Sequence, residues 1–329
     1  MNRGSRALAA TVATCGLAAI APVTAGAAPT VSKLRVEAGG RALDSGTSYV
    51  NDTARVSTAK DQCGGTGRSY TAQGPTPAGL VQHARNVRAG LRPFYVSDAY
   101  YGSGRTLIVC RIGAFGAFGS QAWLYKVDHR VILDEEGQPP KAAPNQYPLE
   151  RGDEVLWYFA DFGSGRNTGD ELALRTPARV RPNRPFAVRA VAYDWEGNAT
   201  PAKDVAISGD ATAVTDANGW ATVKAPREGR FRLRARRGND IPAAPTRTCV
   251  DANLDRCPAV RGEQIFGTGR GDAIPGTAGA DTVIARGGDD RVYVGRGGPD
   301  AVSCGGGIDS VRASGNDRVA RDCERVVRV

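Results

Sequence analysis

An aspartate recurs at short, nearly constant intervals along the C-terminal end of the 329-residue chain. An apolar residue stands two positions after each aspartate, and a glycine stands two positions before all but the first. The positions are Asp272, Asp281, Asp290, Asp300, Asp309 and Asp317, at intervals of 9, 9, 10, 9 and 8 residues. A unit of this length holds one short strand and one turn, and its apolar residue is buried only when units stack. The pattern therefore predicts a β-solenoid over residues 263–329.

The residue types and the interval resemble the calcium-binding nonapeptide repeat G-G-x-G-x-D-x-U-x of RTX toxins and related secreted proteins. The resemblance implies a parallel β-roll in which two units make one full turn, so that Asp272 stacks near Asp290 and Asp281 near Asp300. It also implies that the six aspartates are calcium ligands, because calcium accepts flexible cages of carboxylate and carbonyl oxygens. A stack of like charges over one thin apolar stripe is expected to be poorly stable without the ion.

A metal-free solenoid is the alternative, because few glycines match the first two consensus positions and the intervals of 10 and 8 imply irregular turns. In that case arginines neutralise the aspartates directly. The candidates are Arg286, Arg291, Arg296, Arg312 and Arg318. Cys304 and Cys323 lie 19 residues apart, close to one full turn, and a disulfide between them makes a metal less essential. Both interpretations remain open from the sequence.

The first 27 residues have the layout of a secretory signal peptide. Arg3 and Arg6 precede an Ala-rich apolar run, which ends at the small-residue triplet 25–27. The run is broken and too short for a membrane anchor. Cys15 raises the alternative of a lipoprotein, although Thr14 is a poor residue before a lipidated cysteine. The sequence predicts a secreted, extracellular protein without a transmembrane segment in the mature chain.

Removal of this segment leaves six of the seven cysteines. An even number in an exported chain predicts disulfides, and the absence of a C-x-x-C pair argues against a thiolate metal site. Six cysteines allow 15 connectivities. Proximity along the chain favours the pairs Cys63–Cys110, Cys249–Cys257 and Cys304–Cys323.

Residues 30–168 predict a small β-rich α+β domain. Leu80, Val81, Ala84 and Val87 stand at helical spacing, and the stretches around them alternate as strands do. The order of a helix, "LIVCRIG", "WLYKVDHR" and "YPLERGDEVLWYF" resembles the domain of unknown function that is related to the C-terminal β-domain of transcobalamin. The matching residues are Trp123, Tyr125, Val127, Tyr147, Leu149, Gly152, Asp153 and Trp157.

Two features of this region bear on function. Asp128-His129 replaces the Asn-Gly that the family has in the turn after the first of these strands. In cobalamin carriers such a domain helps to cover the corrinoid, but the accompanying helical domain is absent here. Trp123, Tyr125 and Trp157 are therefore either core residues or the lining of a hydrophobic groove for a small, cobalamin-like ligand.

Residues 172–247 consist of short alternating strands between turns, which predicts a β-sandwich. "YDWEGNATP" and "TDANGWATVKAP" resemble bacterial immunoglobulin-like domains, which often serve as spacers. Residues 248–262 are expected to form a disulfide-closed connector. The whole chain is thus predicted to be mainly β and multidomain, with an α+β domain, an Ig-like sandwich and a C-terminal parallel β-roll.

The net charge of +9 comes from an excess of arginine, most of it in residues 172–247. Such an excess attracts anionic cell-wall polymers, but it is also a compositional habit of GC-rich genomes. The arginines form no dense cluster among aromatic residues, so no nucleic-acid partner is expected. The modular layout resembles secreted proteins of high-GC bacteria such as actinobacteria.

Motifs of common enzyme classes are absent: the chain has no G-x-S-x-G, no H-E-x-x-H and no Walker loop, and it has two histidines. We expect a non-catalytic, secreted binding or adhesion protein at the cell surface, with an extracellular or cell-wall partner and calcium-stabilised repeats. The alternative is a small-ligand binder with a metal-free solenoid.

Overall fold

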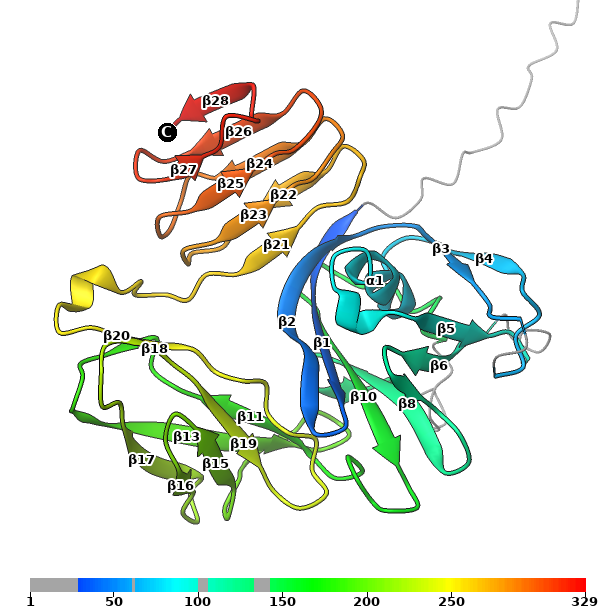
Figure 1. Ribbon diagram of the computed structural model, residues 1–329, viewed down its shortest axis with the longest axis horizontal. Helices are drawn as coiled ribbons and strands as arrows, with labels where there is room; N and C mark the ends of the chain where they lie inside the picture. Colours follow the sequence, from blue (N-terminus) through cyan, green and yellow to red (C-terminus); the bar gives the residue numbers. More distant parts are fainter. Residues whose placement is uncertain (1–28, 61–62, 100–105, 133–142) are drawn as a thin grey trace, which may run out of the picture.

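The computed structural model describes residues 29–60, 63–99, 106–132 and 143–329 (Figure 1). Strands dominate these residues, which confirms the prediction of a mainly β, multidomain chain. The expected signal peptide, with Cys15, lies outside the described residues. Within the described ranges, no helix is long and apolar enough to cross a membrane.

The first region is built on strands β2, β1, β10, β8 and β9, which lie side by side in that order within one sheet. β1 runs antiparallel to β2 and parallel to β10, so the sheet is mixed. The elements are β1 (Thr30–Ala38), β2 (Arg41–Asn51), β3 (Ala54–Ser57), β4 (Ser69–Ala72), α1 (Pro77–Ala84), η1 (Ala89–Leu91), β5 (Phe94–Ser97), β6 (Ile108–Ile112), β7 (Phe115–Gly116), β8 (Gln121–Val127), β9 (Arg130–Val131) and β10 (Glu154–Asp161). One core joins the helix, the two short hairpins and the inner face of the sheet.

The helix α1 occurs where the apolar spacing predicts it. Thr76 caps its start by accepting a hydrogen bond from the Gly79 N–H at 3.1 Å, and proline occupies the first turn, where no N–H is needed. Leu80, Val81 and Ala84 are buried against the sheet. The helix ends at Ala84, so Val87 packs against the core from the loop that follows.

The second region is a β-sandwich with its own core. Its strands are β11 (Glu171–Arg175), β12 (Arg179–Val180), β13 (Pro185–Tyr193), β14 (Ala199–Pro201), β15 (Ala206–Gly209), β16 (Ala213–Val214), β17 (Trp220–Lys224), β18 (Gly229–Phe231), β19 (Leu233–Arg236) and β20 (Thr248–Val250). β20 falls in the predicted connector, yet it pairs with β12 and β18. The sandwich therefore extends beyond the predicted boundary at residue 247, and the connector, with the short helix η3 (Leu254–Arg256), begins after β20.

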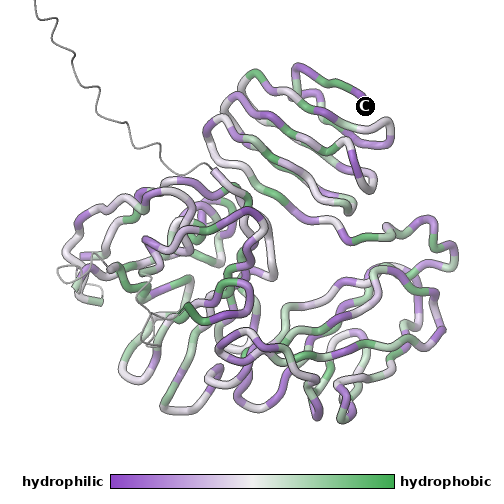
Figure 2. Tube along the Cα trace, turned by 180° about the vertical axis from the view of Figure 1, so that it is seen from behind, coloured by the Kyte–Doolittle hydropathy of each residue, from purple (hydrophilic) through white to green (hydrophobic). Residues whose placement is uncertain are grey.

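The third region is a parallel solenoid with two rows of strands. One row holds β21 (Gln264–Phe266), β23 (Thr282–Ile284), β25 (Ala301–Ser303) and β27 (Arg318–Val319), and the other holds β22 (Ala273–Pro275), β24 (Arg291–Val294), β26 (Ser310–Ala313) and β28 (Arg325–Arg328). The register pairs Ile274 with Val292 and Val283 with Val302, so two units make one turn. These side chains are at most 3% exposed and form the narrow core. Figure 2 shows short hydrophobic segments that recur in successive turns.

The solenoid continues the sheet of the first region, which the sequence did not predict. β21 pairs in parallel with β2, opposing Ser48 to Ile265 and Tyr49 to Phe266. The rings of Tyr49 and Phe266 stack with centroids 5.7 Å apart. Val50 of β2 belongs to the solenoid core. The first turn of the repeats is therefore covered by the first region rather than left open.

All three expected disulfides are present: Cys63–Cys110, Cys249–Cys257 and Cys304–Cys323. The paired cysteines lie 47, 8 and 19 positions apart in the sequence. The first links a loop to β6, the second closes the connector, and the third clips two turns of the solenoid.

Candidate functional site

The repeated aspartates form two ladders inside the solenoid. All six side chains are buried, with at most 5% of each residue exposed. One oxygen of an aspartate accepts the backbone N–H of the aspartate one turn earlier in the chain, at 2.7–2.9 Å. The accepting and donating residues are Asp290 and Asp272, Asp309 and Asp290, Asp300 and Asp281, and Asp317 and Asp300. The repeated carboxylate thus holds each turn to the next, and the predicted stacking of Asp272 on Asp290 and of Asp281 on Asp300 is confirmed.

The second carboxylate oxygen divides the aspartates into two groups. In the first group, a threonine or serine three or four positions earlier donates a hydrogen bond from its backbone N–H to this oxygen. The pairs are Thr268 with Asp272, Thr277 with Asp281 and Ser314 with Asp317, at 2.5–2.6 Å. Both threonine hydroxyls also donate to their aspartates. These three carboxylates are satisfied by the protein alone.

In the second group the outer oxygen is buried and has no hydrogen-bond partner. This group contains Asp290, Asp300 and Asp309. The residues four positions before them are Arg286, Arg296 and Gly305, so the threonine of the first two units is missing. Three unsatisfied carboxylate oxygens thus lie in the central turns of the solenoid. An orphaned buried acceptor is costly, so it calls for a proton or a cation.

The pKa values of two members of this second group, Asp290 and Asp300, are raised. Burial, together with the charges of Asp272 and Asp309, raises the pKa of Asp290 to about 7. Burial and the charges of Asp281 and Asp317 raise the pKa of Asp300 to about 6. The ladder hydrogen bonds favour the ionised form but do not outweigh burial. Near neutral pH the carboxylates of Asp290 and Asp300 therefore exchange between the ionised and the protonated form.

The arginine-paired alternative is wrong. Within residues 263–329, all of which the structure describes, no arginine forms an ion pair with an aspartate of the ladders. Arg270 does form an ion pair, but its partner is Asp52 of the first region. The five arginines proposed for this role are exposed on the outer surface. The aspartates point inward because their ladder partners are backbone N–H groups, and long guanidinium side chains remain hydrated outside.

Calcium was expected at all six aspartates, and the donor atoms fit it at three of them. Asp290 and Asp309 in one ladder and Asp300 in the other could each offer an unshared oxygen. Backbone carbonyls of the turns are the other ligand type that calcium accepts. No cluster of three or more His, Cys, Asp or Glu side chains suited to a metal is found in the part of the chain that the structure describes. Any calcium here would therefore rest on single carboxylates supplemented by carbonyls.

The aromatic residues of the first region are core residues. Trp123, Tyr125 and Trp157 are 5%, 6% and 1% exposed, and Tyr125 packs on Trp157 with ring centroids 5.1 Å apart. The indole N–H of Trp123 donates to the Phe115 carbonyl and that of Trp157 to the Pro77 carbonyl. Of the two interpretations offered by the sequence, core packing is the one that this burial supports, because a ligand could reach these rings only by displacing the core.

The turn between β8 and β9 carries Asp128-His129 in place of the Asn-Gly of the domain that the sequence resembles, and the structure gives the reason. Asp128 and His129 both have positive φ, 48° and 69°, in a two-residue turn where Asn-Gly is favoured. Left-handed backbone costs about 1 kcal/mol per residue. In return, the His129 ring stacks on Tyr193 of the sandwich, with centroids 3.7 Å apart, and its Nδ1 lies 3.0 Å from Glu171 Oε1. Glycine at this position would make neither contact.

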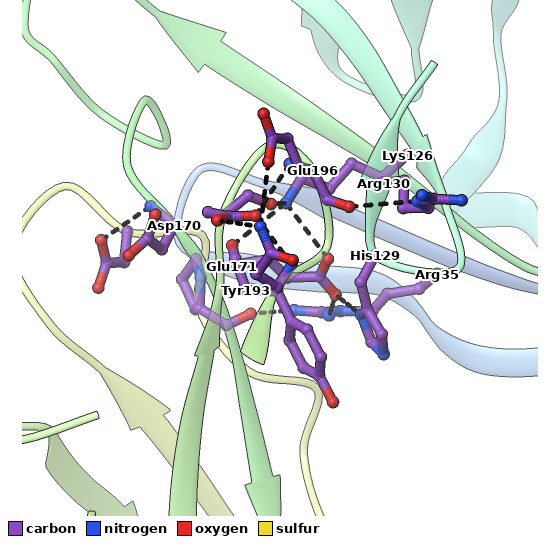
Figure 3. Close-up of polar contacts among 12 residues, drawn as sticks. Arg35, Lys126, His129, Arg130, Asp170, Glu171, Tyr193 and Glu196 are labelled. Atoms are coloured by element: carbon purple, nitrogen blue, oxygen red, sulfur yellow. Dashed lines mark hydrogen bonds and ion pairs between the residues drawn. The ribbon is translucent and has the colours of Figure 1, made fainter. Parts of the chain in front are cut away.

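Glu171 is the centre of a buried charge cluster between the first region and the sandwich (Figure 3). Arg35 lies 2.9 Å and Lys126 3.7 Å from its carboxylate, and all three are at most 2% exposed. Arg35 also approaches Glu37, and Lys126 donates to the Asp194 carbonyl at 2.9 Å. Burial raises the pKa of Glu171, but the hydrogen bond of His129 and the charges of Arg35 and Lys126 outweigh it and the pKa is lowered.

The sequence did not predict this cluster, because Arg35 and Glu171 are 136 positions apart and the members of the cluster follow no period. One signal pointed to it: in the Asp128-His129 turn, a histidine stands where a tight turn favours glycine. A search against family models, against curated proteins and against solved structures found no match.

Proposed function

We propose that this chain is a secreted, non-catalytic binding or adhesion protein of the cell exterior, whose C-terminal solenoid is stabilised by calcium. The observation that carries the calcium proposal is the set of three buried, unpartnered carboxylate oxygens on Asp290, Asp300 and Asp309. They occur in the central turns, where the hydroxyl partners of the first units are missing. The three disulfides support a role in an oxidising compartment.

Calcium would act here as a counter-ion that enters the folded solenoid. It would remove the cost of ionised, buried carboxylates and would compete with protons for the same oxygens. Sites of this type in extracellular modules are weak, with a Kd of about 10⁻⁴–10⁻³ M. The solenoid would then be loaded outside the cell, where calcium is abundant, and weakened wherever calcium is scarce.

The environment of the histidines supports a non-catalytic role. His83 Nε2 lies 2.8 Å from Asp52, and His129 Nδ1 contacts Glu171. Among the described residues, neither imidazole hydrogen-bonds to a Ser, Thr or Cys side chain that it could activate. His83 joins helix α1 to the loop after β2, and His129 joins the first region to the sandwich. Both contacts are structural.

Hydrogen exchange of the complete mature chain, followed by mass spectrometry, tests the calcium proposal. Peptides from β22 to β26 are expected to exchange more slowly in millimolar calcium than in chelator, because the ion reduces opening of the central turns. Peptides from the sandwich serve as the internal control and should not change. Equal protection of the solenoid with calcium and with chelator would refute calcium stabilisation and leave a metal-free, disulfide-clipped solenoid.

A further inference from the structure

A pocket of about 570 Å³ opens where the three regions meet. Its walls carry cations from all parts of the chain. They are Lys33 of β1 and Arg88 of the first region, Arg175 of β11, Arg247 just before β20, and Arg261 ahead of β21. This volume lies within the range of small-molecule sites. No single region forms the pocket, so it exists only in the assembled chain.

The pocket holds more positive than negative side chains. With Arg35, which also lines the pocket, six cations stand against two lining carboxylates, Glu154 and Glu263. Lys33 is paired with Glu263 at 2.7 Å. The Arg35 guanidinium at the pocket wall is matched by Glu171 in the buried cluster. These pairs leave an excess of positive charge on the arginines that come from the sandwich and from the connector.

Three arginines of the pocket have no carboxylate partner within the described residues. Arg175 and Arg247 are exposed and form no ion pair there, and Arg261 donates only to Thr176 and to the Pro177 carbonyl. Burial lowers the pKa of Arg261. A guanidinium fixed by carbonyls keeps its remaining N–H groups in a defined orientation, the arrangement that suits carboxylate and phosphate oxygens.

The stacked pair of His129 and Tyr193 forms part of the same wall. The Tyr193 hydroxyl accepts a hydrogen bond from Arg175 at 3.2 Å, so the aromatic pair and this arginine are coupled. His129 Nδ1 is engaged by Glu171, while Nε2 has no hydrogen-bond partner among the described residues. The strained turn at Asp128-His129 therefore brings a polar ring edge to a basic cavity.

We propose that this junction pocket binds a small organic anion that carries carboxylate or phosphate groups. Arg175, Arg247 and Arg261 would hold the anionic group, and the His129–Tyr193 pair would border the rest of the molecule. The site uses none of the solenoid aspartates, so it goes beyond the calcium proposal and stands or falls separately from it.

Isothermal titration of the complete mature chain in physiological salt tests this inference, with glucose 6-phosphate and glucuronate as probes and neutral glucose as the reference. Saturable binding of either acid, with none of glucose, is expected. The acid that binds more tightly identifies the anionic group as phosphate or carboxylate. Absence of saturable binding by both acids would overturn the proposal.

A matched pair of double variants locates the site. Arg175→Gln with Arg247→Gln is expected to weaken binding by at least about tenfold, since each charge-assisted hydrogen bond is lost. Arg230→Gln with Arg291→Gln removes the same charge from exposed positions outside the pocket and should leave the affinity within about twofold. Equal weakening by both pairs would mean diffuse attraction by the net charge and would also overturn the proposal.

Discussion

At the scale of single residues, the two carboxylate oxygens of each repeated aspartate have different roles. One oxygen links successive turns through a backbone N–H, and this role is common to both ladders. The other oxygen depends on the residue four positions earlier. Thr268 and Thr277 satisfy it in the first two units, whereas Arg286 and Arg296 leave it unpartnered in the next two. The repeated Asp therefore forms the ladder, and the residue four positions earlier decides whether its second oxygen has a hydrogen-bond partner.

Asp290→Asn tests this division. Asparagine keeps the acceptor for the Asp272 N–H and removes a buried charge, so at about pH 8 in chelator the variant should gain about 1–3 kcal/mol of stability. Its gain on adding calcium should be smaller than that of the natural chain. Chemical denaturation with and without calcium measures both effects.

Asp272→Asn is the matched control for that variant. The outer oxygen of Asp272 accepts from Thr268, and an amide N–H₂ placed there meets donors instead of acceptors. This variant should lose stability both with and without calcium. If both asparagine variants behaved alike, the distinction between satisfied and unsatisfied aspartates would be wrong.

At the scale of elements, the solenoid is a stack of strands of two to four residues around a core one side chain wide. Such a stack depends on contacts between neighbouring turns, because no single turn buries enough apolar surface. The Cys304–Cys323 disulfide spans about one turn and holds the last turns together. The central turns, which carry Asp290 and Asp300, rely on the ladders.

The solenoid is expected to lose stability as pH rises in the absence of calcium. The folded-state pKa values of Asp290 and Asp300, about 7 and about 6, lie above the ordinary value, so the neutral forms favour the folded state. Their contribution is complete below about pH 4 and is lost as pH rises through the range from about 6 to 7.

Calorimetry in chelator at several pH values measures this loss as a falling transition temperature of the solenoid. Calcium should restore the transition on the alkaline side and have little effect on the acid side, because protons and calcium occupy the same oxygens. A transition that stays constant across this pH range in chelator would show that the aspartates remain ionised at no cost.

At the scale of the whole molecule, two kinds of contact join the three regions. The solenoid joins the first region by strand pairing, since β21 extends the sheet at β2 and Val50 covers the end of the repeat core. The sandwich joins it through buried charges around Glu171. Paired backbone groups and charges in an interface that excludes water limit relative motion, which a pocket built from all three regions requires.

Glu171→Gln should strongly destabilise the assembled chain. Lys126 would stay buried without its counter-charge, and Arg35 would keep only Glu37, at 3.5 Å; breaking such a buried cluster costs about 3–5 kcal/mol. Because the pKa of Glu171 is lowered in the folded chain, its contribution is present above about pH 4 and is lost as pH falls further. Chemical denaturation at neutral and at acid pH measures the loss.

Glu196→Gln provides the matched control for this variant. Glu196 is exposed on a neighbouring turn of the sandwich, and its substitution should change stability by less than about 0.5 kcal/mol. Similar effects of the two substitutions would mean that the buried cluster contributes nothing to the joint between the regions.

The sequence by itself determined those features that are set within short segments. The period of the aspartates predicted the solenoid, because each Val or Ile can be buried only by its copy one turn away, and the resemblance to the nonapeptide repeat implied the two-unit turn. The three disulfides followed from proximity along the chain, since each joins cysteines that are neighbours in the sequence order. Helix α1 followed from its apolar spacing and the cap at Thr76.

Tertiary structure decided everything that joins segments distant in the chain. The pairing of β2 with β21, the cluster of Arg35 with Glu171, and the basic pocket all unite residues that share no local pattern. Likewise, the sequence left both a groove and a core open for the aromatic strands, and the packing around Trp157 favours the core. The physical reason is that periodicity reports which face of an element is buried, whereas the partner of that face depends on how the regions assemble.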